Sequence, residues 1–170
     1  MGKTYGGWYV LYVKSRHEKR VHQRLKDLKL NSFLPLVQTV RQWSDRKKKI
    51  KKPLFPNYVF VEIATSKDLY TSCSVPGTFQ FIKCGGNFSR LTLNELNYIK
   101  TLIGLKDIIN LELTSSIPQK GETRKINFGP LKGLEGEILE ASNCNKILIR
   151  IEALNQSVIA TVPLTCLSEK

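Results

Sequence analysis

The sequence predicts an α+β N-terminal domain, in which helices flank an antiparallel sheet, followed by a small all-β barrel. The first prediction comes from residues 8–104, whose apolar patterns read β-α-β-β-α-β-α. The second comes from residues 121–168, where short apolar segments recur at intervals of roughly ten residues. Charge separates the two parts. Residues 1–104 hold 19 Lys+Arg and 6 Asp+Glu, a net charge of +13, whereas residues 105–170 hold eight of each.

The first two elements follow from apolar spacing. Residues 8–14 (WYVLYVK) are aromatic or β-branched and apolar on both faces, which is typical of a central strand. Residues 16–29 predict a helix, because Val21, Leu25 and Leu28 form one apolar stripe. Ser15 is the expected helix cap.

The middle of the domain reads as extended chain. Residues 32–40 form a second apolar extended segment, and Pro35 indicates a sheet edge or bulge. We expect residues 37–52 to form a long basic β-hairpin that turns at residues 44–46. Residues 57–63 (NYVFVEI) are a further strand that is apolar on both faces.

The last elements of the domain are shorter. Residues 66–74 predict a short helix or turn region, and residues 79–84 predict a strand that ends at two glycines. Thr92 and Glu95 have the spacing of a capping box, so a helix should run from there to about Gly104.

Residues 105–120 are expected to be a linker, so the proposed domains span residues 1–104 and 121–170. The second is expected to be a five-stranded barrel. Its strands are predicted at residues 125–128, 135–140, 146–151 and 158–162.

Several functional classes lack support in the sequence. No catalytic motif, phosphate-binding loop or metal-ligand spacing is present, so we expect no enzyme, no cofactor and no metal. The four cysteines are widely spread, and the two histidines, His17 and His22, lie on a basic helix. A Cys–His nucleophile pair is left open but has no support. With no apolar run long enough for a membrane helix and no signal peptide, a cytoplasmic protein is expected.

Clustered cations indicate nucleic acid as one partner. Six of the seven residues at positions 46–52 are Lys or Arg, and the predicted first helix carries a second group. A solvated hairpin surface is the alternative explanation. Tyr9, Tyr12 and Trp43 lie among these cations and could stack on bases. The expected nucleic-acid contacts are Lys14, Arg16, Arg20, Arg24, Arg46, Lys47 and Lys48.

Large apolar residues also exceed what one face of a small domain needs. They gather around residues 53–63 (PLFPNYVFVEI). Either helices cover both faces of the sheet, or one face keeps an apolar patch that accepts a partner helix.

The chain resembles the NusG family of transcription elongation factors over nearly its full length. The resemblance is carried by WYVLYVK, the basic helix, PLFPNYVFVE, and VPG followed by FIKCGG. RKINFGPLKGLEGEI is similar to the KOW motif that opens the family's C-terminal SH3-like barrel. The similarity is greatest to the specialised, RfaH-like and UpxY-like antiterminators.

This resemblance implies a non-enzymatic, monomeric antitermination factor that binds RNA polymerase and non-template DNA. The pocket for the polymerase clamp helices would hold Tyr9, Phe55, Pro56, Tyr58, Phe60 and Phe81. The contact with the gate loop of the second-largest polymerase subunit would fall on Tyr70, Thr71 and Ser72. The DNA positions matched without a gap are Lys14, Arg20 and Arg24.

The barrel of relatives binds ribosomal protein S10 or Rho, and the matching positions here are Leu134, Ala153 and Leu154. A fold switch of this domain stays open. Two other functions also stay open: a general NusG-type factor that acts with Rho, and a ribosome-associated RNA-binding KOW protein.

Overall fold

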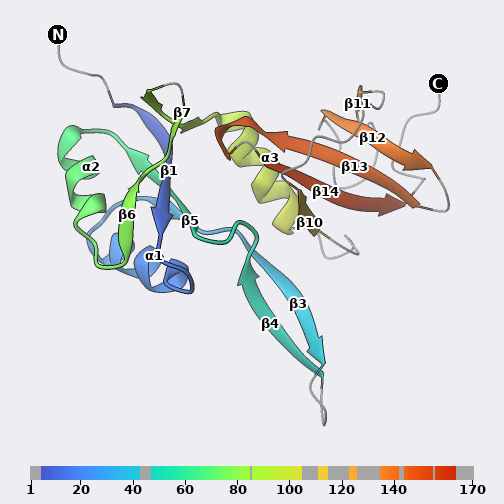
Figure 1. The fold of residues 1–170 in the computed structure, drawn as a ribbon, viewed down its shortest axis with the longest axis horizontal. Helices are drawn as coiled ribbons and strands as arrows, with labels where there is room; N and C mark the ends of the chain where they lie inside the picture. Colours follow the sequence, from blue (N-terminus) through green and yellow to red (C-terminus); the bar gives the residue numbers. More distant parts are fainter. Residues whose placement is uncertain are drawn as a thin grey trace. The chain divides into compact units, whose positions relative to one another are not determined.

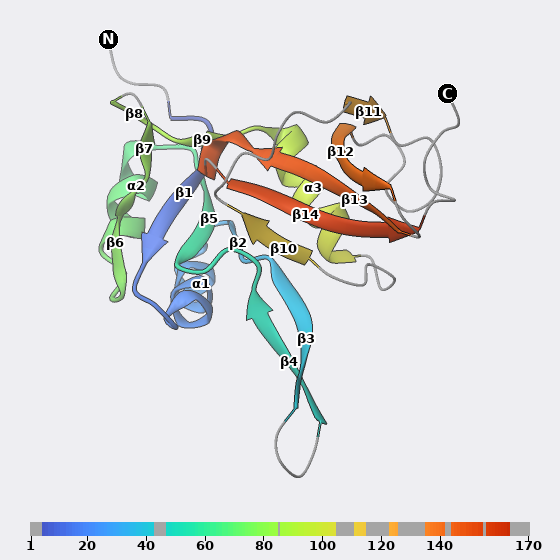
Figure 2. The ribbon, with the colours of Figure 1, turned by 45° about the vertical axis from the view of Figure 1, so that its right-hand side comes forward.

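The computed structural model describes residues 5–42, 47–84, 86–104, 111–114, 123–125, 135–141, 144–154 and 156–163. The chain divides into two compact units, Met1–Leu93 and Asn94–Lys170, and each is treated by itself. Figure 1 shows the elements and Figure 2 a second view of the same ribbon.

The main sheet of the first unit has the order β2-β5-β1-β6, and β9 also pairs with β1. All its pairings are antiparallel, as predicted. The central strands are β1 (Gly7–Val13) and β5 (Tyr58–Ile63). Shorter strands complete it: β2 (Ser32–Phe33), β6 (Thr78–Phe81) and β9 (Arg90–Leu91).

Alternate residues of the central strands face opposite ways. The helix face carries Leu11, Val13, Val59, Val61 and Ile63, which pack against α1 (Glu18–Asp27) and α2 (Ser66–Cys73). The opposite side, named the aromatic face, carries Trp8, Val10, Tyr12, Tyr58 and Phe60. Val21 and Leu25 of α1 are buried against the helix face, so α1 closes it.

Two further hairpins pair outside this sheet. β3 (Leu36–Gln42) pairs with β4 (Lys47–Pro53) in the register Leu36↔Pro53 to Gln42↔Lys47, which confirms the predicted long hairpin. Its predicted turn at residues 44–46, like Trp43, lies outside the described residues. β7 (Lys83–Cys84) pairs with β8 (Asn87–Phe88).

The start of α1 corrects one prediction. The helix begins at Glu18 with His17 as its N-cap, so Ser15 is not the cap and Arg16 is not helical. Arg16 has a left-handed backbone (φ 62°), because the chain must turn sharply between β1 and α1. Gly77 (φ +100°) lies against this turn, where an added Cβ would come within 3.2 Å of His17. The Lys14 amide donates to the Gly77 carbonyl at 2.8 Å, so this turn is tied to the start of β6.

α2 begins with a capping box, in which Thr65 is the N-cap and Asp68 the third helical residue. The Thr65 hydroxyl accepts from the Asp68 amide at 3.2 Å, and the Asp68 carboxylate accepts from the Thr65 amide at 2.8 Å. These hydrogen bonds, led by the one from the Thr65 backbone, hold the pKa of Asp68 below its ordinary value.

The second unit holds α3 (Leu93–Gly104, beginning as predicted directly after Thr92) and a five-stranded antiparallel sheet of order β10-β14-β13-β12-β11. The strands are β10 (Leu111–Thr114), β11 (Thr123–Lys125), β12 (Glu135–Ala141), β13 (Cys144–Ile151) and β14 (Gln156–Pro163). A short 3-10 turn, η1 (Glu152–Leu154), follows β13.

Residues 105–120 are not a linker throughout, because β10 lies within them and pairs with β14. Only the start of the predicted strand at residues 125–128 falls on described residues. β11 ends there, at Lys125. The Glu95 carboxylate accepts a hydrogen bond from the Ala153 amide at 3.3 Å, which joins α3 to η1. This contact agrees with a boundary between the two units at the start of α3.

Candidate nucleic-acid and partner interfaces

The exposed side of α1 and the turn before it carry a basic surface. Lys14 and Arg16 are exposed in the turn, and Arg20 is exposed on the helix. Arg24 is half-buried, and its Nη1 donates to the Pro76 carbonyl at 3.3 Å. The structure therefore brings together the four predicted nucleic-acid contacts of this region, and three of them are freely accessible.

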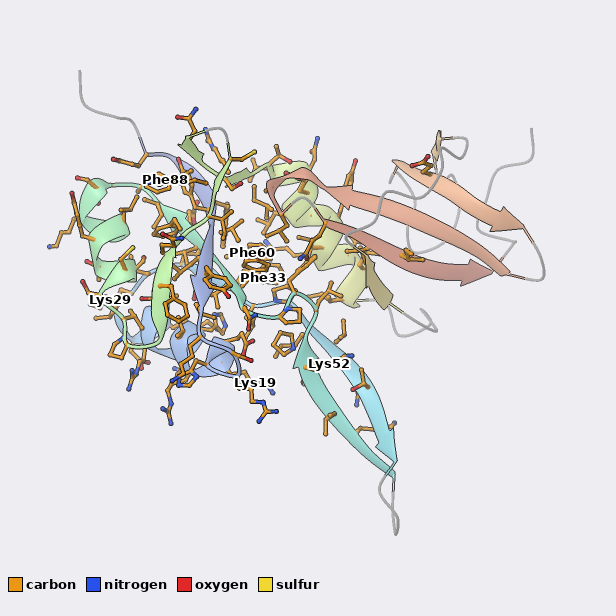
Figure 3. The ribbon with its side chains drawn as sticks, in the orientation of Figure 1. Lys19, Lys29, Phe33, Lys52, Phe60 and Phe88 are labelled. Atoms are coloured by element: carbon orange, nitrogen blue, oxygen red, sulfur yellow. The ribbon has the colours of Figure 1, made fainter. Side chains whose placement is uncertain are left out.

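Two bonds from the first turn of α1 attach this helix to the chain around the hairpin. Glu18 is 6% exposed, and its Oε1 accepts from the Asn57 amide at 3.0 Å. Asn57 is the residue just before β5, and it has a left-handed backbone (φ 67°). Its amide donates to Glu18 of α1. Lys19 Nζ donates to the Lys51 carbonyl on β4 at 2.7 Å, and Figure 3 shows Lys19 and Lys52 near this junction.

The other predicted nucleic-acid residues are only partly described. Lys47 and Lys48 lie in β4, where they pair with Gln42 and Arg41, and Arg46 lies outside the described residues. Further along β4, the side chains of Lys49, Lys51 and Lys52 are exposed. The basic residues of β4 and α1 are therefore adjacent where Lys19 meets Lys51.

An aromatic cluster lies at one end of the aromatic face. Tyr12 pairs directly with Tyr58 across β1 and β5, and their ring centroids are 5.8 Å apart. Tyr12 also stacks on Phe79 of β6 at 5.5 Å. Phe79 is 60% exposed, and both tyrosines are half-buried, so the cluster offers ring faces to a partner.

A second aromatic group, of Phe33, Phe55 and Phe60, lies largely out of solvent. Phe55 and Phe60 each have 0% exposure and meet edge to face at 5.8 Å. Phe33 stacks on Phe60 with their ring centroids 6.1 Å apart. Figure 3 labels both residues. Pro56, next to Phe55, is exposed. These buried rings hold the loop before β5 in place.

The predicted clamp pocket is split between the two faces of the sheet. Phe55, Tyr58 and Phe60 belong to the aromatic side, whereas Tyr9 and Phe81 pack in the core of the helix face. Tyr9 meets Phe81 edge to face at 6.3 Å and is 8% exposed. Sequence analysis grouped Tyr9 with Tyr58, whereas the structure places Tyr12 and Phe79 beside Tyr58. The period-two alternation of WYVLYVK places Tyr9 and Tyr12 on opposite faces of the sheet. The sequence alone could therefore have separated Tyr12 from Tyr9.

A groove of about 850 Å³ lies between α1 and α2. Arg24, Leu28, Tyr70 and Thr71 line it, and Tyr70 is 72% exposed. Two of the three predicted gate-loop residues therefore share a surface with a predicted DNA contact. Ser72 does not reach this surface, because it is 0% exposed and its hydroxyl donates to the Asp68 carbonyl at 2.7 Å.

The histidines of α1 have structural partners. His22 Nδ1 lies 2.9 Å from the Ser32 hydroxyl on β2. Burial, with a smaller contribution from the positive charge of Lys26, lowers the pKa of His22 below its ordinary value of 6.5. His17 Nδ1 lies 3.1 Å from the Ser15 carbonyl.

The predicted partner residues of the second unit are covered where they are described. Ala153 and Leu154 are each 8% exposed, in the η1 turn that bonds to Glu95. Leu134 lies outside the described residues.

The described residues hold no metal cluster and no membrane-spanning helix. No group of three or more His, Cys, Asp or Glu in this part of the chain could hold a metal ion. None of the described helices has the length and apolarity needed to span a membrane. Cys73 and Cys84 are free thiols, and burial raises the pKa of Cys73.

Comparisons with known proteins agree with this architecture. A family model described as transcription termination factor nusG matches residues 6–100. The transcription termination/antitermination protein NusG of Staphylococcus epidermidis is 28% identical over 147 residues, which are 78% of each chain. Its namesake from Streptococcus pyogenes serotype M3 is 27% identical over 175 residues and 96% of each chain.

Among solved structures, the fold is similar to one titled "Domain interaction in Thermotoga maritima NusG". The TM-score is 0.54 and the identity 22%, over 92% of this chain and 93% of that one. Because the family model covers more than half of the residues, the chain belongs to the NusG family of transcription termination/antitermination factors.

Proposed function

We propose that this chain is a specialised antitermination factor that binds the RNA polymerase clamp and non-template DNA, and so suppresses pausing and termination at particular operons. The observation that carries the proposal is the pair of accessible surfaces on the first unit. One is the aromatic cluster of Tyr12, Tyr58 and Phe79, and the other is the basic surface of α1. Differential binding to the elongating state is enough for such a factor, without covalent chemistry.

The clamp contact is assigned to the aromatic cluster. Tyr58 and Pro56 are accessible members of the predicted pocket, and Tyr12 and Phe79 extend the same surface. Half-exposed aromatic rings are typical anchors for an amphipathic partner helix. Phe55 and Phe60 are buried and stabilise the fold, and Tyr9 and Phe81 belong to the core of the opposite face.

The non-template strand is assigned to Lys14, Arg16, Arg20 and Arg24, with Arg46, Lys47 and Lys48 of the hairpin region as further phosphate contacts. The support is the exposure of Lys14, Arg16 and Arg20, which lie close together in the sequence in the turn before α1 and in α1 itself. The gate-loop contact is assigned to Tyr70 and Thr71, since both line the groove beside Arg24.

For the second unit we propose an SH3-like barrel of the KOW type at residues 121–170, preceded by β10. Four antiparallel strands, β11 to β14, lie within this range, and β10 completes the five-stranded sheet by pairing with β14. The proposed partner, ribosomal protein S10 or Rho, would use Leu134, Ala153 and Leu154. Because Ala153 and Leu154 are buried in this structure, a partner would reach them only after η1 becomes accessible.

A general NusG-type function with Rho is the second candidate. It is favoured by the names of the relatives, which are termination/antitermination proteins rather than operon-specific ones. The mapping of polymerase-bound protein on genomic DNA separates the two. Occupancy confined to one or a few operons supports the specialised factor, whereas occupancy throughout the genome supports the general one.

The clamp assignment is tested by a polymerase pull-down with Tyr58→Ala and Phe79→Ala. We expect both variants to stay folded and to lose most of their polymerase binding. Phe55→Ala is a poor probe, because truncation of a fully buried Phe costs about 3–5 kcal/mol of folding stability. Full pull-down by a folded Tyr58→Ala/Phe79→Ala double variant would overturn the assignment.

The DNA assignment has its own test. Arg20→Ala with Arg24→Ala should weaken recruitment to a paused elongation complex while polymerase-clamp binding persists. The matched control is Lys83→Ala with Lys100→Ala, which removes two exposed cations that lie outside α1, the β3–β4 hairpin and the groove beside Arg24. Equal recruitment by the Arg20/Arg24 variant and this control would contradict the assignment.

A further inference from the structure

The β3–β4 ribbon has a structure that the proposed single-strand contact does not require. In the part of the chain that the structure describes, β3 and β4 pair only with each other. Seven residue pairs extend the ribbon over roughly 24 Å at about 3.4 Å a residue. Figure 1 shows it extending away from the β2-β5-β1-β6 sheet.

The two faces of the ribbon differ in exposure. By register, Gln38, Lys49 and Lys51 share one face, named the cationic face, and all three side chains are exposed. Leu36 and Pro53, at the base of the ribbon, lie on the same face and are half-buried. The other face carries Val37, Thr39 and Ile50, all half-buried, with Lys52 beside them. Because three side chains of the cationic face are exposed and three of the opposite face are half-buried, the cationic face is the one that a partner can reach more fully.

The ribbon is also fixed at its base. Lys19 of α1 donates to the Lys51 carbonyl at 2.7 Å, and the Leu54 amide donates to the Pro35 carbonyl at 2.8 Å across the base of the hairpin. An isolated two-stranded hairpin is marginal in water, so these bonds hold it in a defined direction relative to α1. A held ribbon can meet a rigid partner with little loss of conformational entropy.

These features match the grooves of double-helical DNA. The major groove of B-DNA is about 12 Å wide and admits a two-stranded β-ribbon. Lysines two residues apart on one face can reach successive phosphates, and a glutamine amide between them can bond to a base edge. The major groove of A-form RNA is too deep and narrow for protein side chains to reach the base edges in this way.

We propose that the cationic face of the β3–β4 ribbon docks in the major groove of a B-form DNA duplex, with Lys49 and Lys51 on phosphates and Gln38 towards the base edges. This goes beyond the proposed function, which concerns single-stranded DNA and polymerase. In this arrangement α1, with Arg46, Lys47 and Lys48, contacts the single strand, and Gln38, Lys49 and Lys51 contact the duplex.

The test measures fluorescence anisotropy of the full chain with a labelled 20-base-pair DNA duplex (a probe length we choose) over a series of salt concentrations. Each lost phosphate contact should lower the slope of log affinity against log salt by about 0.9. We expect this decrease for Lys49→Gln and again for Lys51→Gln. The matched control, Lys52→Gln, removes the same charge from the opposite face and should leave the slope unchanged. Circular dichroism establishes that each variant is folded.

Three results would overturn the inference. One is an equal decrease in slope for Lys52→Gln, which would mean that the charge acts without regard to face. The second is equal affinity of the chain for an RNA duplex of the same sequence. The third is an unchanged slope for the folded Lys49→Gln/Lys51→Gln variant. Polymerase pull-down by these variants is measured in parallel, so the ribbon can fail the test while the proposed function stands.

Discussion

The helix face and the aromatic face of the main sheet are made by alternate residues of the same strands, yet they differ in kind. On the helix face, Leu11, Val13 and Val61 are completely buried beneath α1 and α2. On the aromatic face, Tyr12 and Tyr58 stay half-exposed beside Phe79. Trp8, Val10 and Phe60 of the aromatic face are buried as well, so this face stays accessible only at the end that carries Tyr12 and Tyr58. The comparison teaches that alternation along one strand can give a wholly buried face and a face that keeps accessible rings at one end.

Substitutions at two neighbouring residues of β1, one on each face, test this difference between the faces most directly. Leu11→Ala should cost about 2–5 kcal/mol of folding stability, because it leaves a cavity in the helix face. Tyr12→Ala should cost about 1–2 kcal/mol, mainly through the lost ring contacts with Tyr58 and Phe79, but should reduce polymerase binding. Urea unfolding and pull-down measure the two effects. Equal stability losses in the two variants would show that the Tyr12 side chain contributes as much to folding as that of Leu11.

The same contrast exists on α1, between a buried and an exposed neighbour. Glu18→Ala should cost about 1–3 kcal/mol, because the Asn57 amide loses its acceptor in a largely buried position. Lys19→Ala, its control, should change stability by less than about 0.5 kcal/mol, because Lys19 is exposed. Chemical denaturation of both variants checks this. The prediction fails if Lys19→Ala is the more damaging change.

A smaller effect is expected at α2, the second helix that covers the helix face. Thr65→Ala removes the hydroxyl that accepts from the Asp68 amide, and loss of such a cap typically costs about 1 kcal/mol. Ser66→Ala, one residue later, serves as the control. Thermal unfolding should separate the two variants, and identical midpoints would contradict the capping role.

The smallest effect is a pH dependence at the edge of the helix face. Because the pKa of His22 is lowered by burial and by Lys26, the unfolded chain binds this proton more readily than the folded chain. Stability from this residue is therefore complete above its ordinary pKa of 6.5 and declines as the pH falls below that value. Unfolding of wild type and His22→Gln between pH 8 and about 5 tests it. The decline should be weaker in His22→Gln and should persist in His17→Gln, the control.

Much of the first unit could be predicted because its signals are local. The apolar runs of β1 and β5 and the long hairpin are confirmed. The start of α1 was wrong by two residues, since apolar spacing does not reveal that Arg16 turns left-handed. That turn depends on Gly77, sixty-one positions away in the chain and in contact with His17.

The candidate site was predicted in part, for a related reason. The chemistry of Tyr58 and Arg20 was evident from residue type, but residue type does not say which aromatic rings share a face. Phe79 joins the cluster where the register of β1 and β6 shifts between Tyr12 and Val13. Such an irregularity arises from strand pairing and leaves no trace in local sequence. The same holds for β10, whose partner β14 lies far along the chain.

The lysines of β4 have a consequence for the protein's behaviour in concentrated solution. A free ribbon exposes strand edges, which invite pairing with other chains and aggregation. Lys49, Lys51 and Lys52 place charge along this edge, Pro53 ends it without an amide donor, and Lys19 occupies one of its carbonyls. The positive charge that we propose for DNA binding would thus also make two copies repel. Neutralising these lysines together should reduce solubility, so single substitutions are the sounder probes of binding.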